Sequence, residues 1–143
     1  MILNALIEKY GFKEGLDISG DKITKWPYDV AKPTKAKLKT ILDEYKLIEA
    51  KENTRKAAKD IRNEALQNLT VELNGNVFQT RPSDEVNFRL CFESMSDTDV
   101  EEWILDDNAV KSVNKADLIA VYSQGLAQSK VIYQTYKDAL KAL

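Results

Sequence analysis

The sequence predicts an α+β protein that is rich in helix, with short antiparallel β-hairpins, a long connector helix and a long C-terminal helix. Apolar residues recur at helical spacing near the start of the chain, through its middle and along its last part. Between these stretches, short alternating segments flank turn-forming glycine and asparagine residues. The chain has 143 residues, of which 43% are hydrophobic and 31% charged, and a chain of this length can bury a core without metals or disulfides.

The N-terminal part is predicted to form a short helix and then a hairpin. Residues 2–10 carry apolar side chains at helical spacing, and Gly11 follows as a helix stop. Residues 16–18 and 22–26 alternate around the glycine-containing turn at 19–21, which is typical of a small β-hairpin. Trp26 lies at the end of this hairpin, where a large ring usually covers the strands and could instead be an exposed interface anchor.

A long helix is predicted next, because Thr34 is a plausible N-cap and neither glycine nor proline follows before about Leu69. At 1.5 Å per residue this helix would span roughly 50 Å. Its apolar stripe is interrupted by the polar segment 50–56. We therefore expect the chain to divide there, into an N-terminal region of residues 1–50 and a C-terminal domain of residues 51–143. The pattern leaves open whether the helix is continuous through the polar segment.

The C-terminal domain is predicted to contain two hairpins and two helices. Asn74-Gly75 between the alternating segments 70–73 and 77–80 is the strongest short hairpin signal. Ser83 is expected to cap a following helix. A second hairpin is expected over residues 100–113, around the turn Asp106-Asp107-Asn108, with Trp103 in its first strand.

The last helix is the most regular segment, with Asn114 as its expected N-cap and Asp117 three positions on. Its apolar residues are spaced alternately three and four apart, with one polar position at Ser129, as at the a and d positions of a coiled coil. This heptad seam consists of Ile119, Tyr122, Leu126, Ser129, Tyr133, Tyr136, Leu140 and Leu143. An ordinary core helix packed on its own hairpins gives the same spacing, so both alternatives stay open. The predicted residues of a protein–protein interface are Trp26, Ile119, Tyr122, Leu126, Tyr133, Tyr136 and Leu140.

The composition gives no support to most enzyme classes. The chain has no histidine and one cysteine, Cys91, so neither a Cys/His zinc site, a histidine-based triad nor an intramolecular disulfide can be assembled. We expect Cys91 to be a buried small hydrophobe. The carboxylate pairs at 101–102 and 106–107 lack the spacing of a calcium loop, and no glycine-rich phosphate loop occurs. We therefore predict no catalytic residue, no cofactor and no metal.

Charge is distributed unevenly along the chain. Residues 32–62 contain ten basic and five acidic residues, whereas residues 72–107 contain ten acidic and two basic residues. Opposite blocks of this kind can orient neighbouring molecules. Nucleic acid is not an expected partner, because the lysines of 32–62 are interleaved with acids and lack aromatic residues. Neither a membrane span nor a secretory signal is expected, since no run of about 18 apolar residues and no basic n-region occurs.

From Arg55 to Leu143, a specific order of residues can be laid out. It comprises Arg55 and Ile61 on a helix, Gly75 and Phe78 in a hairpin, Ser83, Phe88 and Phe92 on a helix, Trp103, Asp107-Asn108, Val113, Leu118, and Tyr133 and Tyr136 on the terminal helix. This order resembles an uncharacterised domain of phage and prophage tail-fibre-associated proteins. The N-terminal part, with Gly15-Leu16-Asp17, Ile23, Trp26, Pro33-Thr34 and Leu38, is similar to XkdW-like proteins of phage tail-fibre gene clusters.

The resemblance implies a non-enzymatic virion structural or adaptor protein of the tail or tail-fibre attachment region. Such a protein would be made in the host bacterial cytoplasm, reside in the tail region of the virion, and bind copies of itself and other tail or tail-fibre proteins. The alternative is a tail-fibre assembly chaperone that is absent from the mature virion. A third hypothesis is a small nucleic-acid-binding protein that uses the basic block 32–62.

Overall fold

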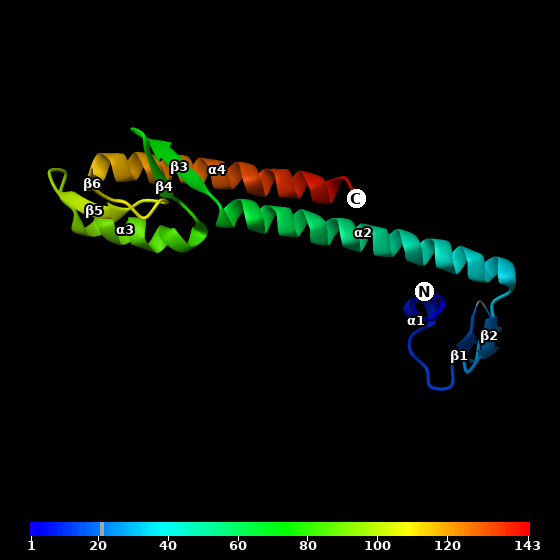
Figure 1. Cartoon of the computed structure of the whole chain (residues 1–143). Helices are drawn as coiled ribbons and strands as arrows, with labels where there is room; N and C mark the ends of the chain where they lie inside the picture. The colour runs from blue at the N-terminus through cyan, green and yellow to red at the C-terminus, as the bar shows by residue number, and fades with distance from the viewer. Residues whose placement is uncertain (21) are drawn as a thin grey trace. The chain divides into compact units, whose positions relative to one another are not determined.

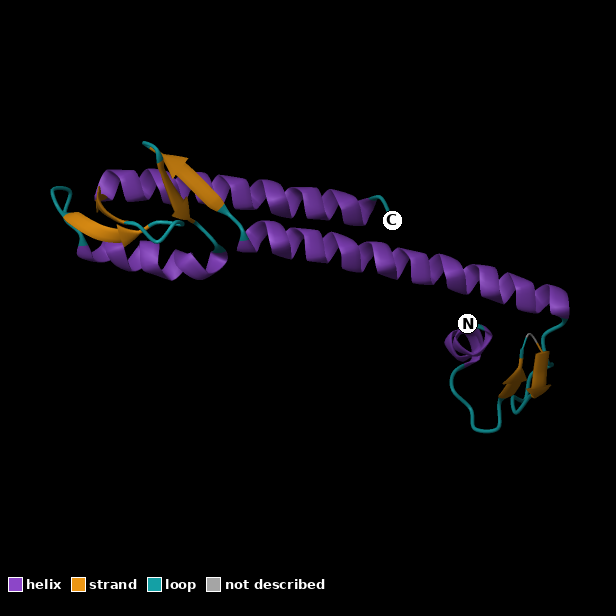
Figure 2. Ribbon diagram, viewed as in Figure 1, coloured by secondary structure: helices purple, strands orange, loops and turns teal. Residues whose placement is uncertain are grey.

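The computed structural model describes residues 1–20 and 22–143, and its elements confirm the predicted α+β class (Figures 1 and 2). Along the chain they are α1 (Ile2–Tyr10), β1 (Asp17–Ser19), β2 (Lys22–Lys25), α2 (Lys35–Gln67), β3 (Thr70–Leu73), β4 (Asn76–Gln79), the 3-10 turn η1 (Pro82–Asp84), α3 (Glu85–Ser94), β5 (Val100–Ile104), β6 (Val110–Asn114) and α4 (Lys115–Lys141). Each hairpin is its own two-stranded antiparallel sheet. Within the described residues, no helix is long and apolar enough to cross a membrane.

The chain divides into two compact units, Met1–Thr54 and Arg55–Leu143. The division falls inside the polar segment 50–56, close to the predicted boundary after residue 50. Helix α2 is continuous through this segment, which answers the question that the hydrophobic pattern left open. Lysine, glutamate and arginine dominate the segment, and such residues favour a helix even where no apolar stripe holds it.

In the first unit, α1 and the β1–β2 hairpin enclose a small core with the start of α2. The buried residues are Ala5, Leu6, Ile23, Leu38 and Ile41. Thr34 is the N-cap of α2, as predicted, because its Oγ1 accepts a hydrogen bond from the backbone N–H of Lys37 at 3.2 Å. Ile18 and Ile23 are paired across the hairpin. The predicted turn includes Asp21, which lies outside the described residues.

Three aromatic rings cover one end of this unit. The centroid of the Trp26 ring lies 5.2 Å from that of Tyr10 and 4.6 Å from that of Tyr28. The indole N–H of Trp26 donates a hydrogen bond to the carbonyl of Val30 at 2.7 Å. Trp26 is half-buried, so the structure places this predicted interface residue in an intramolecular cluster that joins α1 to the loop after β2.

The second unit is built from two hairpins that lie beside α3 and α4 (Figure 2). The β3–β4 hairpin has the predicted turn, with φ of 53° at Asn74 and 76° at Gly75, the left-handed pair that a type I′ turn requires. The two hairpins are joined where the backbone N–H of Asp106 donates to the carbonyl of Val77 at 2.9 Å. The buried core comprises Val71, Phe78, Phe88, Met95, Leu105, Val113, Leu118 and Val121.

The two predicted helix caps of this unit have different outcomes. Asn114 caps α4, because its Oδ1 accepts a hydrogen bond from the backbone N–H of Asp117 at 2.8 Å. The prediction for Ser83 is wrong, since Pro82–Asp84 form the 3-10 turn η1 and α3 begins after Asp84 without a side-chain cap. The Asp84 carboxylate instead accepts the backbone N–H and the Nε–H of Arg81, each at 3.0 Å.

A close contact lies on the face of α4 that enters the core. Gly125 is buried in the middle of the helix, and a Cβ atom at this position would lie 2.7 Å from the Cβ of Thr80. Thr80 is itself 9% exposed, and its backbone N–H donates a hydrogen bond to the carbonyl of Leu69 at 3.0 Å. The helix therefore approaches the end of β4 more closely than any residue with a side chain allows.

Candidate functional site

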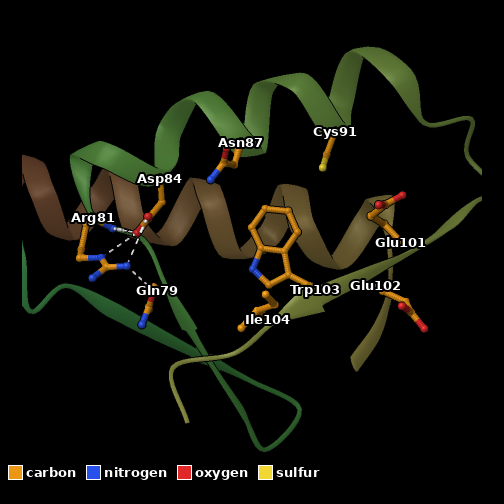
Figure 3. A pocket seen from close by; sticks show the side chains of 9 residues that line it. All are labelled: Gln79, Arg81, Asp84, Asn87, Cys91, Glu101, Glu102, Trp103 and Ile104. Carbon is orange, nitrogen blue, oxygen red and sulfur yellow. Dashed lines mark hydrogen bonds and ion pairs between the residues drawn. The ribbon is translucent and has the colours of Figure 1, made fainter. Parts of the chain in front are cut away.

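A polar cleft of about 420 Å³ opens beside the end of β4 (Figure 3). Its lining comes from β4 and η1, from α3 and from β5. The lining residues are Gln79, Arg81, Asp84, Asn87, Cys91, Glu101, Glu102, Trp103 and Ile104. The lining includes the thiol of Cys91 and the carboxylate pair Glu101 and Glu102. These are the reactive side chains that the sequence brings into consideration for catalysis.

The one cation that lines the cleft is already engaged. The Arg81 guanidinium bonds the Asp84 carboxylate through Nε at 3.0 Å and donates from Nη2 to the side-chain oxygen of Gln79. Gln79 in turn donates its Nε2 to Asp106 Oδ1 at 3.0 Å. Arg81 therefore ties η1 to β4 and leaves the cleft without an uncompensated positive charge for an anionic ligand.

Cys91 lines the cleft from α3 and is half-buried, whereas the sequence predicted a buried residue. Burial raises the pKa of its thiol, and the negative charge of Glu101 raises it further. The thiol is therefore protonated at neutral pH and is a weak nucleophile. Because the chain has no histidine, no imidazole is present to accept its proton.

The carboxylates of β5 do not converge on one point. Successive residues of a strand project to opposite faces, and Glu101 and Glu102 accordingly point away from one another (Figure 3). Trp103 packs inward, with its ring centroid 4.6 Å from that of Phe88. Among residues 1–20 and 22–143, no group of three or more Cys, Asp or Glu side chains is placed to hold a metal ion.

The heptad seam on α4 is mostly displaced from the core face. Leu118, Val121 and Gly125 are the buried residues of α4. The seam lies next to them and leaves three of its members substantially exposed: Ile119 at 44%, Leu126 at 39% and Tyr133 at 42%. Tyr122, Tyr136 and Leu140 are half-buried. Tyr122 belongs both to the seam and to the aromatic cluster of the core, with its ring 5.5 Å from that of Phe88.

A second hollow, which we call the apolar groove, is formed by residues of the last part of α2 and the last part of α4. The two helices run side by side there (Figure 1). The apolar groove has a volume of about 260 Å³ and is lined by Ala58, Ile61, Arg62, Ala65, Val131, Ile132, Thr135, Tyr136 and Ala139. The Arg62 guanidinium lies 4.5 Å from the centre of the Tyr136 ring and 5.8 Å from that of Tyr133. These cation–π contacts join the two helices beside the groove.

Two aliphatic side chains of the apolar groove remain open to solvent. Ile61 is 68% exposed and Val131 is 66% exposed. Exposed aliphatic residues gathered in one hollow are typical of an interaction surface. Of the lining residues, the heptad seam predicts only Tyr136 as part of an interface, because the pairing of α2 with α4 brings together positions that are far apart in the chain.

Comparison with known proteins assigns a family to the second unit. Residues 49–143 match the family described as Domain of unknown function (DUF4376). No curated protein and no solved structure matches the chain. The matched region contains the whole of Arg55–Leu143, so the polar cleft, the heptad seam and the apolar groove all lie within it.

Proposed function

Since the chain belongs to the DUF4376 family through residues 49–143, we propose that this domain serves a non-enzymatic structural or adaptor role, exercised through protein–protein contacts. Its place would be the tail or tail-fibre attachment region of a phage virion. The phage assignment is supported by the order of residues from Arg55 to Leu143, which resembles a domain of tail-fibre-associated proteins. Partners would be copies of the chain and other tail or tail-fibre proteins.

The apolar groove is the observation that carries the contact role. Ile61 and Val131 project beside the small residues Ala58, Ala65 and Ala139. When helices pack by ridges into grooves, the large side chains of one helix fit into the spaces above the small residues of the other. Two copies related by a two-fold axis would place the ridges of each pair against the small residues of the other, because such an interface is self-complementary.

The heptad seam adds a further apolar strip to the same domain. Ile119, Leu126 and Tyr133 are exposed and follow one another at intervals of two helical turns. This strip is available to a neighbouring tail or fibre protein, in keeping with an adaptor that contacts more than one partner.

The polar cleft is compatible with the proposed contact role. Its cation, Arg81, is bound to Asp84 and Gln79. Its thiol has a raised pKa, and its two adjacent glutamates point apart. A general acid–base or nucleophilic site needs groups that converge on a substrate, and the thiol and the two glutamates of the cleft are not arranged in that way.

Purified virions test this proposal. We expect mass spectrometry to find the chain in particles of the phage that encodes it. We also expect the variant Ile61→Glu/Val131→Glu to be lost from the particles. The matched control Val100→Glu/Val110→Glu changes exposed valines of the β5–β6 hairpin and should be retained. A wild-type chain that is made in infected cells but absent from virions would contradict the structural role and favour an assembly chaperone.

A further inference from the structure

A third hollow lies on the first unit, along the first three turns of α2 and the start of α1. It has a volume of about 700 Å³ and is lined by Ile2, Lys35, Ala36, Leu38, Lys39, Leu42, Asp43 and Lys46. We call it the lysine-rimmed groove. Neither the heptad seam nor the apolar groove shares a residue with it, so the lysine-rimmed groove is a separate surface of the protein.

The floor of this groove is aliphatic. Leu38 is 8% exposed, and Ile2 and Leu42 are half-buried. From Lys35 to Lys46 the groove follows α2 for about 16 Å at 1.5 Å per residue. A floor of this kind and length matches the apolar stripe of a helix of about three turns, which is how amphipathic helices bind in grooves.

The rim carries unpaired positive charge. Lys35, Lys39 and Lys46 are exposed, and no ion pair in the part of the chain that the structure describes involves any of them. Asp43 is the single carboxylate among the lining residues. The first turn of α2 contains no acidic residue, so the positive end of the helix dipole adds to the potential of the lysines.

Together, the floor and the rim specify the occupant. We propose that the lysine-rimmed groove binds an amphipathic helix of a partner protein, with aliphatic residues on its buried face and glutamates or aspartates beside them. The aliphatic residues would cover Ile2, Leu38 and Leu42, and the carboxylates would pair with the three lysines. This inference deepens the proposed adaptor function and rests on it, because it names the chemistry of one partner.

A partner helix explains the groove better than a nucleic acid does. Lysines alone would serve phosphate groups, but the aliphatic floor would gain nothing from a phosphate backbone. Single-stranded nucleic acids stack their bases on aromatic rings, and the lining of this groove contains none. An acidic amphipathic helix is the class of ligand that uses both the floor and the rim.

The full-length chain can be tested with a designed peptide. The probe is a helical peptide of roughly 14 residues, or about four turns, with leucines at i, i+4 and i+7 and glutamates flanking them. The control peptide has lysines in place of the glutamates. Binding is measured by isothermal titration calorimetry, and the contacted residues are mapped by amide chemical shifts in NMR spectra.

Two protein variants of equal charge locate the binding site. Lys35→Gln/Lys39→Gln/Lys46→Gln removes the rim, and Lys56→Gln/Lys59→Gln/Lys130→Gln removes three exposed lysines elsewhere. We expect the rim variant to bind the acidic peptide about tenfold more weakly, since each exposed ion pair contributes a factor of about two to three. The control variant should bind like the wild type, and high salt should weaken wild-type binding.

Several outcomes would overturn the inference. These are no binding of the acidic peptide, equal binding of the lysine peptide, equal loss in both variants, or shifts that avoid residues 35–46. Displacement of the acidic peptide by an oligothymidine at those residues would favour a nucleic acid instead. Failure here is distinguishable from failure of the proposed function, because loss from virions is tested with variants of the apolar groove on the other unit.

Discussion

Because Gly125 of α4 lies close to Thr80 at the end of β4, we predict that replacing this helical glycine by alanine lowers the stability of the protein, whereas the same change in most helices raises it. Replacing glycine by alanine in an exposed helix interior stabilises a protein by about 1 kcal/mol, because glycine has the greater conformational freedom when unfolded. At Gly125 the added Cβ would meet the Cβ, Oγ1 and Cγ2 of Thr80 at 2.7, 2.9 and 3.1 Å. We therefore expect Gly125→Ala to destabilise the second unit.

The magnitude follows from how firmly Thr80 is held. Its backbone N–H donates a hydrogen bond to the carbonyl of Leu69 at 3.0 Å and its side chain is buried, so it cannot move away without breaking this hydrogen bond. Overpacking of this kind costs about 1–3 kcal/mol. Taking about 3 kcal/mol for the contact and subtracting about 1 kcal/mol for helix propensity gives a net loss of about 2 kcal/mol.

Urea unfolding of the full chain measures this loss. A Trp26→Phe background leaves Trp103 as the sole tryptophan, and its ring packs on Phe88 in the unit under test. For a slope of about 2 kcal/mol per molar, a loss of about 2 kcal/mol lowers the midpoint by about 1 M. Adding Thr80→Gly to Gly125→Ala should recover part of the loss as a favourable coupling energy.

A neighbouring exposed residue of α4 provides the control variant. Gln124→Ala changes the exposed neighbour of Gly125 on the same helix, and we expect its midpoint to be unchanged or slightly raised. A midpoint for Gly125→Ala that equals or exceeds that of the parent would refute the close contact between α4 and β4. An additive double mutant would show that the loss arises away from Thr80.

Three further predictions concern single groups of the second unit. Asn114→Ala should lower the unfolding free energy by about 1 kcal/mol in urea melts, because it removes the cap on the Asp117 N–H. The hydrogen bond from the Ser96 backbone N–H lowers the pKa of Asp99. The ionised Asp99 therefore stabilises the fold above the unfolded pKa of about 3.9, and this contribution is lost as pH falls through the folded pKa. Asp99→Asn should therefore reduce the loss of unfolding free energy at acid pH, measured by urea melts over a range of pH. Cys91, whose thiol pKa burial raises, should react slowly with a disulfide reagent at neutral pH and faster in alkaline buffer; fast labelling at neutral pH would contradict its placement.

Features that depend on one residue and a single nearby partner were predictable from the sequence. Asn74-Gly75 specifies a type I′ turn through its own backbone preferences, and Asn114 caps α4 through a group three residues away. Ser83 failed as a cap because Pro82 and the Arg81–Asp84 pair stabilise a 3-10 turn first. That competition involves several side chains, and the cap rule considers only one.

Features that depend on packing between distant segments were not predictable. The period of α4 shows an apolar stripe, but the buried face also contains Gly125, which approaches Thr80 closely, and no local pattern records that contact. The apolar groove needs Ile61 and Val131 side by side, and the lysine-rimmed groove needs Ile2 beside Leu38 and Leu42. Both arise from helix pairings that the sequence does not state.

The solution mass of the purified full-length chain, measured by light scattering, tests the proposed contact role most directly. We predict an oligomer for the wild type and for Val100→Glu/Val110→Glu, and a monomer with an unchanged circular dichroism spectrum for Ile61→Glu/Val131→Glu. Charges at Ile61 and Val131 would be desolvated in the interface, which is costly when they are unpaired. A wild-type chain that is monomeric at all concentrations, or an oligomer that keeps its mass in the groove variant, would contradict self-association through the apolar groove.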